Sequence, residues 1–168
     1  MENITKQAYL SFRLNKELFA VNAFKVLEVL EKQNITEIPQ TPDYVLGVIN
    51  FSCEILPVFD TRRKFNMPTL DEKQKFVIIV LDLTIKGQKV LIGTTADGVK
   101  DVIEVVEKEI KEVPEVGSSF NVEFLDGILY RDNGFIMMLN VDKVYAAENV
   151  DILLQNVDKP EIQLEGQD

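Results

Sequence analysis

The residue types that most often carry chemistry are scarce in this chain. Its 168 residues include no histidine and one cysteine, Cys53. Without imidazole there is no histidine acid–base catalysis, no histidine triad and no histidine metal site. One cysteine excludes an internal disulfide and any multi-cysteine zinc or iron–sulfur site. Because no histidine can deprotonate Cys53, we expect it to be a small buried hydrophobic residue rather than a nucleophile.

The carboxylates are the only abundant acid–base groups. Glu54 and Asp60 bracket one predicted strand and lie about 20 Å apart along it, too far for a glycosidase pair within that strand. Asp82 follows an apolar strand, as a phosphoacceptor does in receiver domains, but the first strand ends in Arg13 and Leu14 rather than in a second acidic cluster. We interpret these carboxylates as solvated groups at strand ends. An enzyme with two converging carboxylates is the alternative.

Phosphate and nucleic-acid binding signals are also missing. Gly87, Gly93 and Gly98 do not form a phosphate-binding loop. Arg62-Arg63-Lys64 is the only basic triplet, and we interpret it as a solvated helical turn that could make one charged contact with a partner. The net charge of −10 disfavours nucleic acid and anionic membranes as partners. We expect no catalytic residue, metal site or cofactor.

Short alternating segments separated by turns indicate roughly ten strands and a mainly β protein, built as a barrel or sandwich. Pro57 lies inside one of them, which argues for an edge position or a bulge there. The continuous apolar content of Phe76–Leu83 predicts burial on both faces. The clearest predicted strands are Tyr9–Leu14, Leu18–Val21, Val48–Phe51, Glu54–Asp60, Phe76–Leu83, Gln88–Thr94, Val99–Val106, Leu125–Tyr130 and Phe135–Leu139.

A few short helices accompany the strands. Ala23, Val26, Leu27 and Leu30 follow helical spacing, and Asn22 could cap a helix that contains them. We further predict a helical turn over Arg62–Phe65 and a short helix over Val141–Ala147.

The strands fall into two similar sets, which predicts two small barrels in a single domain over residues 5–150. We place one subdomain at about 15–66, a linker at 67–75, and the second subdomain at about 76–147 together with the N-terminal strand. Residues 151–168 carry five acidic residues and one basic residue, so we expect an acidic, disordered tail. The chain shows no secretory signal and no run of about 18 apolar residues, so the cytoplasm is the expected compartment.

One segment resembles a known family. Residues 47–62 read Gly-Val-Ile-Asn-Phe-Ser-Cys-Glu-Ile-Leu-Pro-Val-Phe-Asp-Thr-Arg, similar to the CheW-like signature Gly-Val-Ile-Asn-Leu-Arg-Gly-x-Ile-x-Pro-Val-x-Asp-Leu-Arg. The match extends in order over about residues 7–147. Further agreement comes from the opening hairpin, Lys25-Val26-Leu27-Glu28-Val29, Asp97-Gly98-Val99-Lys100-Asp101-Val102, Leu125-Asp126-Gly127-Ile128 and Phe135-Ile136-Met137-Met138-Leu139-Asn140.

The resemblance implies two intertwined five-stranded SH3-like β-barrel subdomains and a non-catalytic chemotaxis adaptor. Family members bridge the cytoplasmic tip of chemoreceptors and the regulatory domain of the histidine kinase CheA. The receptor contact implied for this chain lies in the groove between subdomains, and the kinase contact lies at the subdomain ends. The partner-binding residues implied by the match are Val26, Glu28, Gly47, Asn50, Ser52, Arg62 and Val99.

The chain departs from the family at Phe51-Ser52-Cys53, where the signature has Leu-Arg-Gly. The missing arginine removes a multidentate cationic donor, and the missing glycine removes a residue that adopts positive φ without penalty. A left-handed backbone at Cys53 would therefore be strained. These replacements leave open the alternative that the chain is a divergent adaptor that binds other partners.

Three hypotheses follow. An adaptor requires an exposed apolar patch with a polar rim, which we expect around Val26 and Val99. A small-molecule sensor would instead use the groove between the subdomains as a closed apolar pocket. An enzyme would need two acids within about 10 Å of each other in a cleft.

Overall fold

The computed structural model describes residues 5–68, 75–114 and 124–145. Strands occupy most of this part of the chain, and no helix in it is long and apolar enough to cross a membrane. The strands are β1 (Lys6–Leu14), β2 (Glu17–Asn22), β3 (Val26–Glu31), β4 (Val45–Phe51), β5 (Glu54–Phe59), β6 (Val77–Ile85), β7 (Gln88–Ala96), β8 (Gly98–Val106), β9 (Leu125–Arg131) and β10 (Gly134–Leu139). The short helical segments are η1 (Ala23–Lys25), α1 (Thr61–Lys64), η2 (Glu107–Glu109) and α2 (Val141–Val144).

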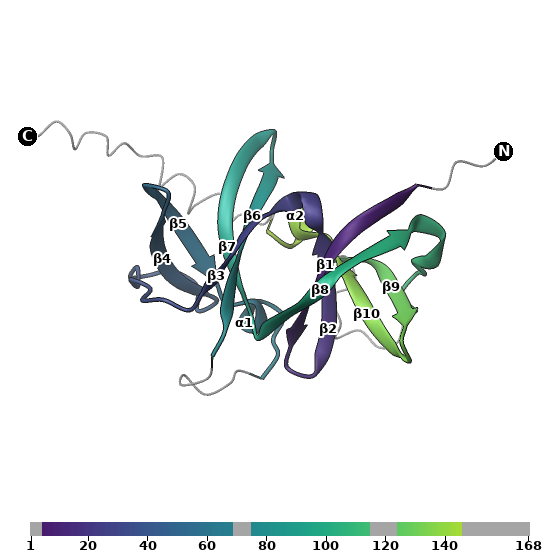
Figure 1. Ribbon diagram of the computed structural model, residues 1–168. Helices are drawn as coiled ribbons and strands as arrows, with labels where there is room; N and C mark the ends of the chain where they lie inside the picture. The colour runs from purple at the N-terminus through teal and green to yellow at the C-terminus, as the bar shows by residue number, and fades with distance from the viewer. Residues whose placement is uncertain (1–4, 69–74, 115–123, 146–168) are drawn as a thin grey trace, which may run out of the picture.

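The strands form two five-stranded sheets that lie side by side, with α1 and α2 between them (Figure 1). Sheet A has the order β8-β1-β2-β10-β9, and sheet B has the order β3-β6-β7-β5-β4. The predicted mainly β class with two five-stranded units and short helices is confirmed. Isolated bridges at Thr36–Val48 and Lys111–Ile128 connect the segment after one edge strand to the opposite edge strand of the same sheet.

The sheets are intertwined because the links between them are short. Three residues join β2 to β3, and Asp97 alone joins β7 to β8. At both links the chain passes from one sheet to the other. Sheet membership therefore differs from the predicted division at residues 67–75: β6 and β7 follow that linker but pair with β3 and β5. Residues 69–74 of the linker and the predicted acidic tail, 151–168, lie outside the described residues.

The two halves of the molecule are built alike. In each sheet, one edge strand pairs antiparallel with the first strand of a hairpin, whose second strand pairs parallel with the strand that precedes a short helix. Asp60 and Asn140 cap the two helices through their side chains. Gly47 and Gly127 occupy matching places beside the two isolated bridges, with φ of 144° and 157°. The sequence shows no repeat that would reveal this equivalence.

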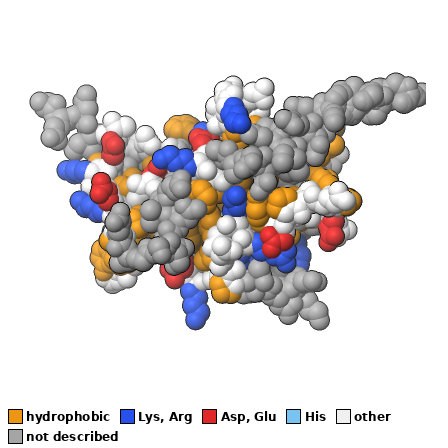
Figure 2. All heavy atoms as spheres, turned by 180° about the vertical axis from the view of Figure 1, so that it is seen from behind, with side chains coloured by type: hydrophobic (Ala, Val, Ile, Leu, Met, Phe, Trp, Pro, Cys, Tyr) orange, Lys and Arg blue, Asp and Glu red, His pale blue; other side chains and the backbone are white. Residues whose placement is uncertain are grey.

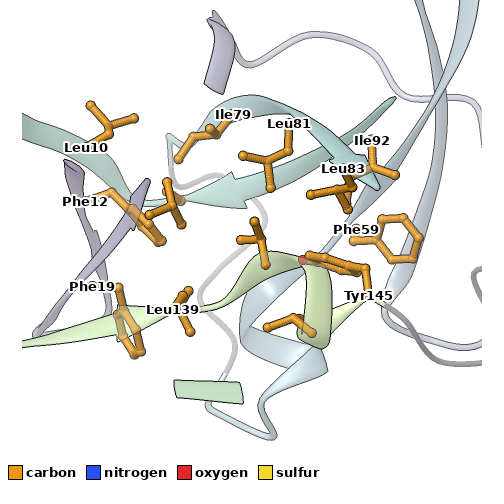
Figure 3. Packing of buried hydrophobic residues seen from close by; sticks show 14 of the residues in the cluster. Leu10, Phe12, Phe19, Phe59, Ile79, Leu81, Leu83, Ile92, Leu139 and Tyr145 are labelled. Carbon is orange, nitrogen blue, oxygen red and sulfur yellow. The ribbon is translucent and has the colours of Figure 1, made fainter. Parts of the chain in front are cut away.

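Three apolar clusters hold the fold together. One lies within sheet A around Leu129 and Met138, and one lies within sheet B around Leu56 and Val58. The largest cluster lies between the sheets and joins side chains of both (Figure 3). Strand β6 contributes alternately to the sheet B cluster and to this central cluster. The predicted burial of this strand on both faces is confirmed, since four consecutive residues, Ile78–Leu81, are buried.

The helix predicted to follow Asn22 is wrong beyond its first turn. Asn22 does cap η1, because its Oδ1 accepts a hydrogen bond from the Phe24 amide at 2.9 Å. From Val26 onward the chain is strand β3, paired with β6. The register shifts between Val26 and Glu28, which is a bulge at Leu27. The bulge interrupts the two-residue alternation, so the half-buried residues Val26 and Leu30 take a spacing that resembles a helix.

Candidate functional site

The tip of the β4–β5 hairpin has a left-handed backbone. Ser52 and Cys53 have φ of 50° and 67°, as the two central residues of a tight hairpin turn require. Asn50 supports the turn, since its Oδ1 accepts a hydrogen bond from the Cys53 amide at 3.1 Å. Cys53 is exposed, so the expectation of a buried thiol is wrong. The sulfur lies at the end of a turn that projects from the sheet, where no core surrounds it.

Gly47 has a packing role in the same hairpin. A Cβ atom at this position would lie 2.0 Å from the carbonyl oxygen of Thr36. The residue is buried, and its φ of 144° is one that side chains rarely adopt. The glycine therefore allows the segment before β4 to bridge onto Val48, and it positions the hairpin.

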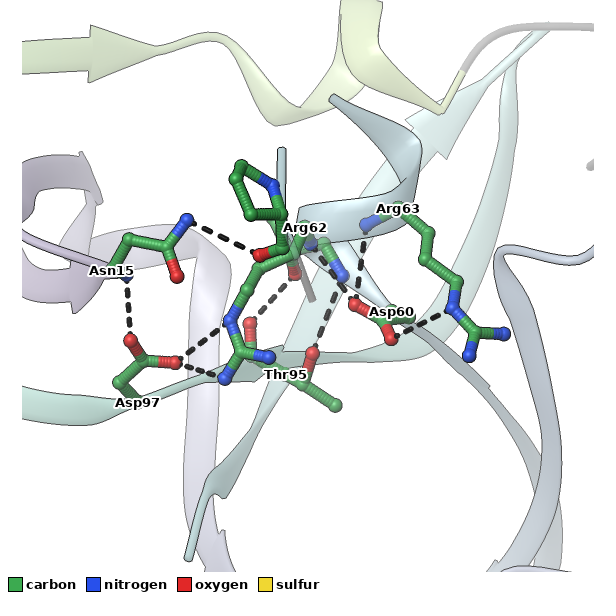
Figure 4. Close-up of polar contacts among 8 residues, drawn as sticks. Asn15, Asp60, Arg62, Arg63, Thr95 and Asp97 are labelled. Carbon is green, nitrogen blue, oxygen red and sulfur yellow. Dashed lines mark hydrogen bonds and ion pairs between the residues drawn. The ribbon is translucent and has the colours of Figure 1, made fainter. Parts of the chain in front are cut away.

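Arg62 joins α1 to the link between the sheets (Figure 4). Its Nε donates a hydrogen bond to Asp97 Oδ1 at 3.0 Å, and its Nη2 forms an ion pair with the same oxygen. The Arg62 and Asp97 side chains are only 11% and 17% exposed. Asp97 Oδ2 also accepts the Asn15 amide at 2.6 Å, and the Asp97 amide donates to the Arg13 carbonyl at 2.8 Å. Through Asp97, Arg62 thus links segments of both sheets.

The basic triplet that contains Arg62 forms α1, as predicted, but it is only partly solvated. Asp60 caps the helix by accepting the Arg62 and Arg63 amides at 3.0 and 3.3 Å. Lys64 Nζ lies 4.4 Å from the centroid of the Tyr44 ring, and burial lowers the pKa of this ammonium group.

A buried hydroxyl network lies next to α1. Thr94 Oγ1 is 2.7 Å from the Tyr145 hydroxyl and also contacts Thr61 Oγ1, which donates to the Thr95 carbonyl at 2.7 Å. Burial raises the pKa of Tyr145 to about 12. The network docks the ends of α1 and α2 on β7, and its hydroxyl groups satisfy one another, so we assign it a structural role.

Strand β3 and the preceding segment η1 present exposed apolar side chains. Phe24 is 87% exposed, and Leu27 and Val29 are 51% and 39% exposed. We call these three residues, with Val26 and Glu28, the β3 patch. Val26 is half-buried against the central cluster, whereas Glu28 is exposed. Large apolar side chains exposed to water, with a polar rim, are typical of a protein-binding surface.

Val99 lies on β8, two residues beyond Asp97, and is half-buried against the central cluster. On the same strand, Val102 is 60% exposed. Among the described residues, the seven predicted partner-binding positions therefore fall in three places. Gly47, Asn50 and Ser52 lie in the β4–β5 hairpin. Arg62 pairs with Asp97, and Val99 follows Asp97 by two residues on β8. Val26 and Glu28 lie in the β3 patch.

Two exposed aromatic side chains were not among the predicted residues. Tyr130 and Phe135 are paired across β9 and β10, with ring centroids 5.0 Å apart, and they are 60% and 58% exposed. A hairpin signal at residues 131–134 predicts this pairing once the register is counted outward from the turn. Phe24 lacks such a signal, because the alternation of its neighbours ends at η1.

Catalytic arrangements are not found among residues 5–68, 75–114 and 124–145. No group of three or more metal-binding side chains occurs there. The carboxylates singled out in the sequence have other tasks: Asp60 caps α1, and Asp82 lies 3.3 Å from Lys89 Nζ in an ion pair. Glu109 accepts the Val106 amide at 2.8 Å, which is the main cause of its lowered pKa.

Two intertwined sheets, an exposed apolar patch and no converging acid–base groups in the described part of the chain define a binding module. Comparison with known proteins agrees. Residues 8–149 match the CheW-like domain family, and the chain belongs to this family of non-catalytic chemotaxis scaffolds.

The similar proteins are distant in sequence. The chain is 23% identical to the chemotaxis protein CheW of Treponema pallidum over 140 residues, which are 83% of this chain and 82% of that protein. It is 37% identical to CheW of Klebsiella aerogenes over 59 residues, 35% of this chain and 36% of that protein. The crystal structure of the scaffolding protein TtCheW from Thermoanaerobacter tengcongensis matches with a TM-score of 0.74 and 28% identity, over 88% of this chain and 93% of that one.

Proposed function

We propose that this protein is an adaptor that couples the cytoplasmic tip of chemoreceptors to the regulatory domain of a CheA-type histidine kinase. In this role it works in the cytoplasm, held at receptor arrays by its partners. The observation that carries the proposal is the β3 patch, since Phe24, at 87% exposure, has its ring in water in the unbound chain. Covering this apolar area with a receptor would release that water and supply binding free energy.

The receptor contact is assigned to the β3 patch and to Val99. Glu28 is exposed, and no ion pair joins it to the described residues. A charged group beside an apolar contact gives that contact an orientation that apolar side chains alone do not define.

The kinase contact is assigned to the β4–β5 hairpin tip, at Asn50 and Ser52. Ile55, directly opposite Asn50 in the register, is 59% exposed and offers an apolar anchor there. The serine at position 52 cannot supply the bidentate pairing of the arginine in the family signature. We therefore expect this kinase contact to depend on Ile55 and on backbone groups more than on charge.

Charge reversal in the β3 patch tests the receptor assignment. We expect Glu28→Lys to weaken binding of a chemoreceptor cytoplasmic fragment at least tenfold, because it reverses a charge inside the interface. Biolayer interferometry measures the affinity, and thermal unfolding should give a nearly unchanged Tm, since Glu28 is exposed. Glu31→Lys is the matched control, because Glu31 is also exposed and ends the same strand. Equal weakening by both variants, or none by Glu28→Lys, would contradict the assignment.

A further inference from the structure

A cavity of about 480 Å³ opens between sheet A and α1. Its lining is mostly apolar and comes from both halves of the molecule, and Figure 3 shows Phe19 and Leu139 side by side in this part of the core. On the rear face, hydrophobic side chains reach the surface in the middle of the molecule, among charged ones (Figure 2). The apolar lining residues are Phe19, Phe65, Met67, Phe124, Leu125, Met137 and Leu139. This volume is within the range of small-molecule sites.

Comparison of the two equivalent halves of the molecule shows why a cavity remains between sheet A and α1. Each short helix ends in an aromatic residue, Phe65 after α1 and Tyr145 after α2. Tyr145 packs on Phe59, the last residue of β5, with ring centroids 5.0 Å apart. The last residue of β10 is the smaller Leu139, so Phe65 meets no ring at that position.

The aromatic side chains leave the middle of the cavity free. Phe65 instead packs on Phe19 and Phe124, with centroids 6.1 and 6.0 Å away. Two flexible thioethers, Met67 and Met137, complete the wall. Aromatic and methionine side chains together accommodate apolar groups of varied shape.

Two charged side chains, Lys64 and Glu17, line the cavity, and they differ in the contacts that they already make. Lys64 lines it, but its ammonium group lies over the Tyr44 ring, which is not part of the lining. Glu17, at the start of β2, also lines the cavity, is exposed, and has no ion pair among the described residues. A ligand in the cavity therefore meets a carboxylate that has no ion pair among the described residues, on a chain whose net charge is −10.

We propose that this cavity is a binding site for small amphipathic cations, in which an aryl or alkyl group fills the apolar interior and an ammonium group pairs with Glu17. The site is separate from the β3 patch and from the hairpin tip, and it does not depend on the adaptor role.

The methionines provide a direct test in the intact protein. The chain has four methionines; Met67 and Met137 line the cavity, whereas Met138 is fully buried in the sheet A cluster. Protein labelled with ¹³C at the methionine methyl groups is titrated with 4-phenylbutylammonium and, separately, with 4-phenylbutyrate. These probes share the apolar body and differ in the sign of the charged group.

We expect saturable shifts of the Met67 and Met137 signals, little change at Met138, and binding of the cation roughly two- to fivefold tighter than of the anion, as one exposed ion pair allows. Glu17→Gln should abolish this preference while keeping the apolar binding, and its exposed position makes misfolding no concern. Leu139→Phe should reduce binding of both probes by filling the cavity. Non-saturable shifts, equal shifts at Met138, or no preference for the cation would each overturn the proposal.

Discussion

At the scale of single residues, backbone conformation explains the residue type required at two positions of the β4–β5 hairpin. Gly47 belongs to the family signature, yet its neighbours show that it is required for packing against Thr36. Cys53 replaces a glycine of that signature at φ 67°. From the missing glycine, the sequence predicts backbone strain at Cys53 if that residue is left-handed. The structure confirms the left-handed conformation.

Restoring glycine at this turn should stabilise the protein. We expect Cys53→Gly to raise the free energy of unfolding by about 1 kcal/mol, because a left-handed conformation costs a side-chain-bearing residue about that much or more. Urea denaturation measures the change. Asn133→Gly, in the matching turn of β9–β10 at φ 63°, is the control and should gain less, since asparagine tolerates this conformation. A larger gain at position 133 would contradict the argument.

The two ion pairs that join the short helices to the links between the sheets differ in burial. Arg62 and Asp97 are 11% and 17% exposed, whereas Lys25 and Asp142 are 31% and 35% exposed at a distance of 2.9 Å. We expect Arg62→Ala to lower the free energy of unfolding by about 3 kcal/mol, because it leaves Asp97 buried without its partner.

Lys25→Ala is the comparison and should cost at most about 1 kcal/mol, as solvent screens that pair. Chemical denaturation of both variants under the same conditions gives the ranking. Similar losses in the two variants would show that Arg62 does not hold the sheets together in the way described.

At the scale of the elements, the strands were predictable where one face meets a continuous core. The β6–β7 and β9–β10 hairpins follow from alternation and turn residues. The expected edge position or bulge at Pro57 is wrong, because β5 lies between β7 and β4 and Pro57 pairs in register with Val48. Proline fits in this interior strand because the pairing of β5 with β7 begins only at Val58. Strand β3 was mistaken for a helix because its bulge breaks the alternation. Assignment of strands to sheets depends on links of one and three residues, whose effect no local pattern reveals.

The docking of the short helices has a pH signature. Tyr145 has a pKa raised to about 12 by burial, whereas it is about 10 in the unfolded chain. The contribution of the protonated Tyr145 hydroxyl to the free energy of unfolding is present below pH 10. It is lost as the pH rises towards 12, because Tyr145 loses its proton at a lower pH in the unfolded chain than in the folded one.

We expect the wild type to lose roughly 2–3 kcal/mol more stability than Tyr145→Phe between pH 9 and pH 12. The difference between the two proteins cancels the lysines and the other tyrosines, which titrate in both. Denaturant unfolding at stepped pH measures it. Parallel stability curves for the two proteins would contradict a buried, protonated hydroxyl.

At the scale of the whole molecule, the intertwined sheets share one central cluster, so they form a single structural unit. Its surfaces nevertheless lie on different elements: the β3 patch on η1 and an edge strand of sheet B, the β4–β5 tip at the end of a hairpin, and the cavity between sheet A and α1. Separate surfaces on a rigid body are what an adaptor needs in order to hold two partners at once. The sequence resemblance implied this role, and the structure adds that Gly47 packs against Thr36 and that Arg62 pairs with Asp97.

The most direct measurement is reconstitution of the purified chain with a chemoreceptor cytoplasmic fragment and the regulatory domain of a CheA-type kinase from the same cell, analysed by sedimentation velocity. The adaptor account predicts one ternary species when all three components are present. With the Glu28→Lys variant, it predicts only the binary complex of the chain with the kinase domain. If the folded chain binds neither partner, or binds them only in mutually exclusive complexes, the account is contradicted.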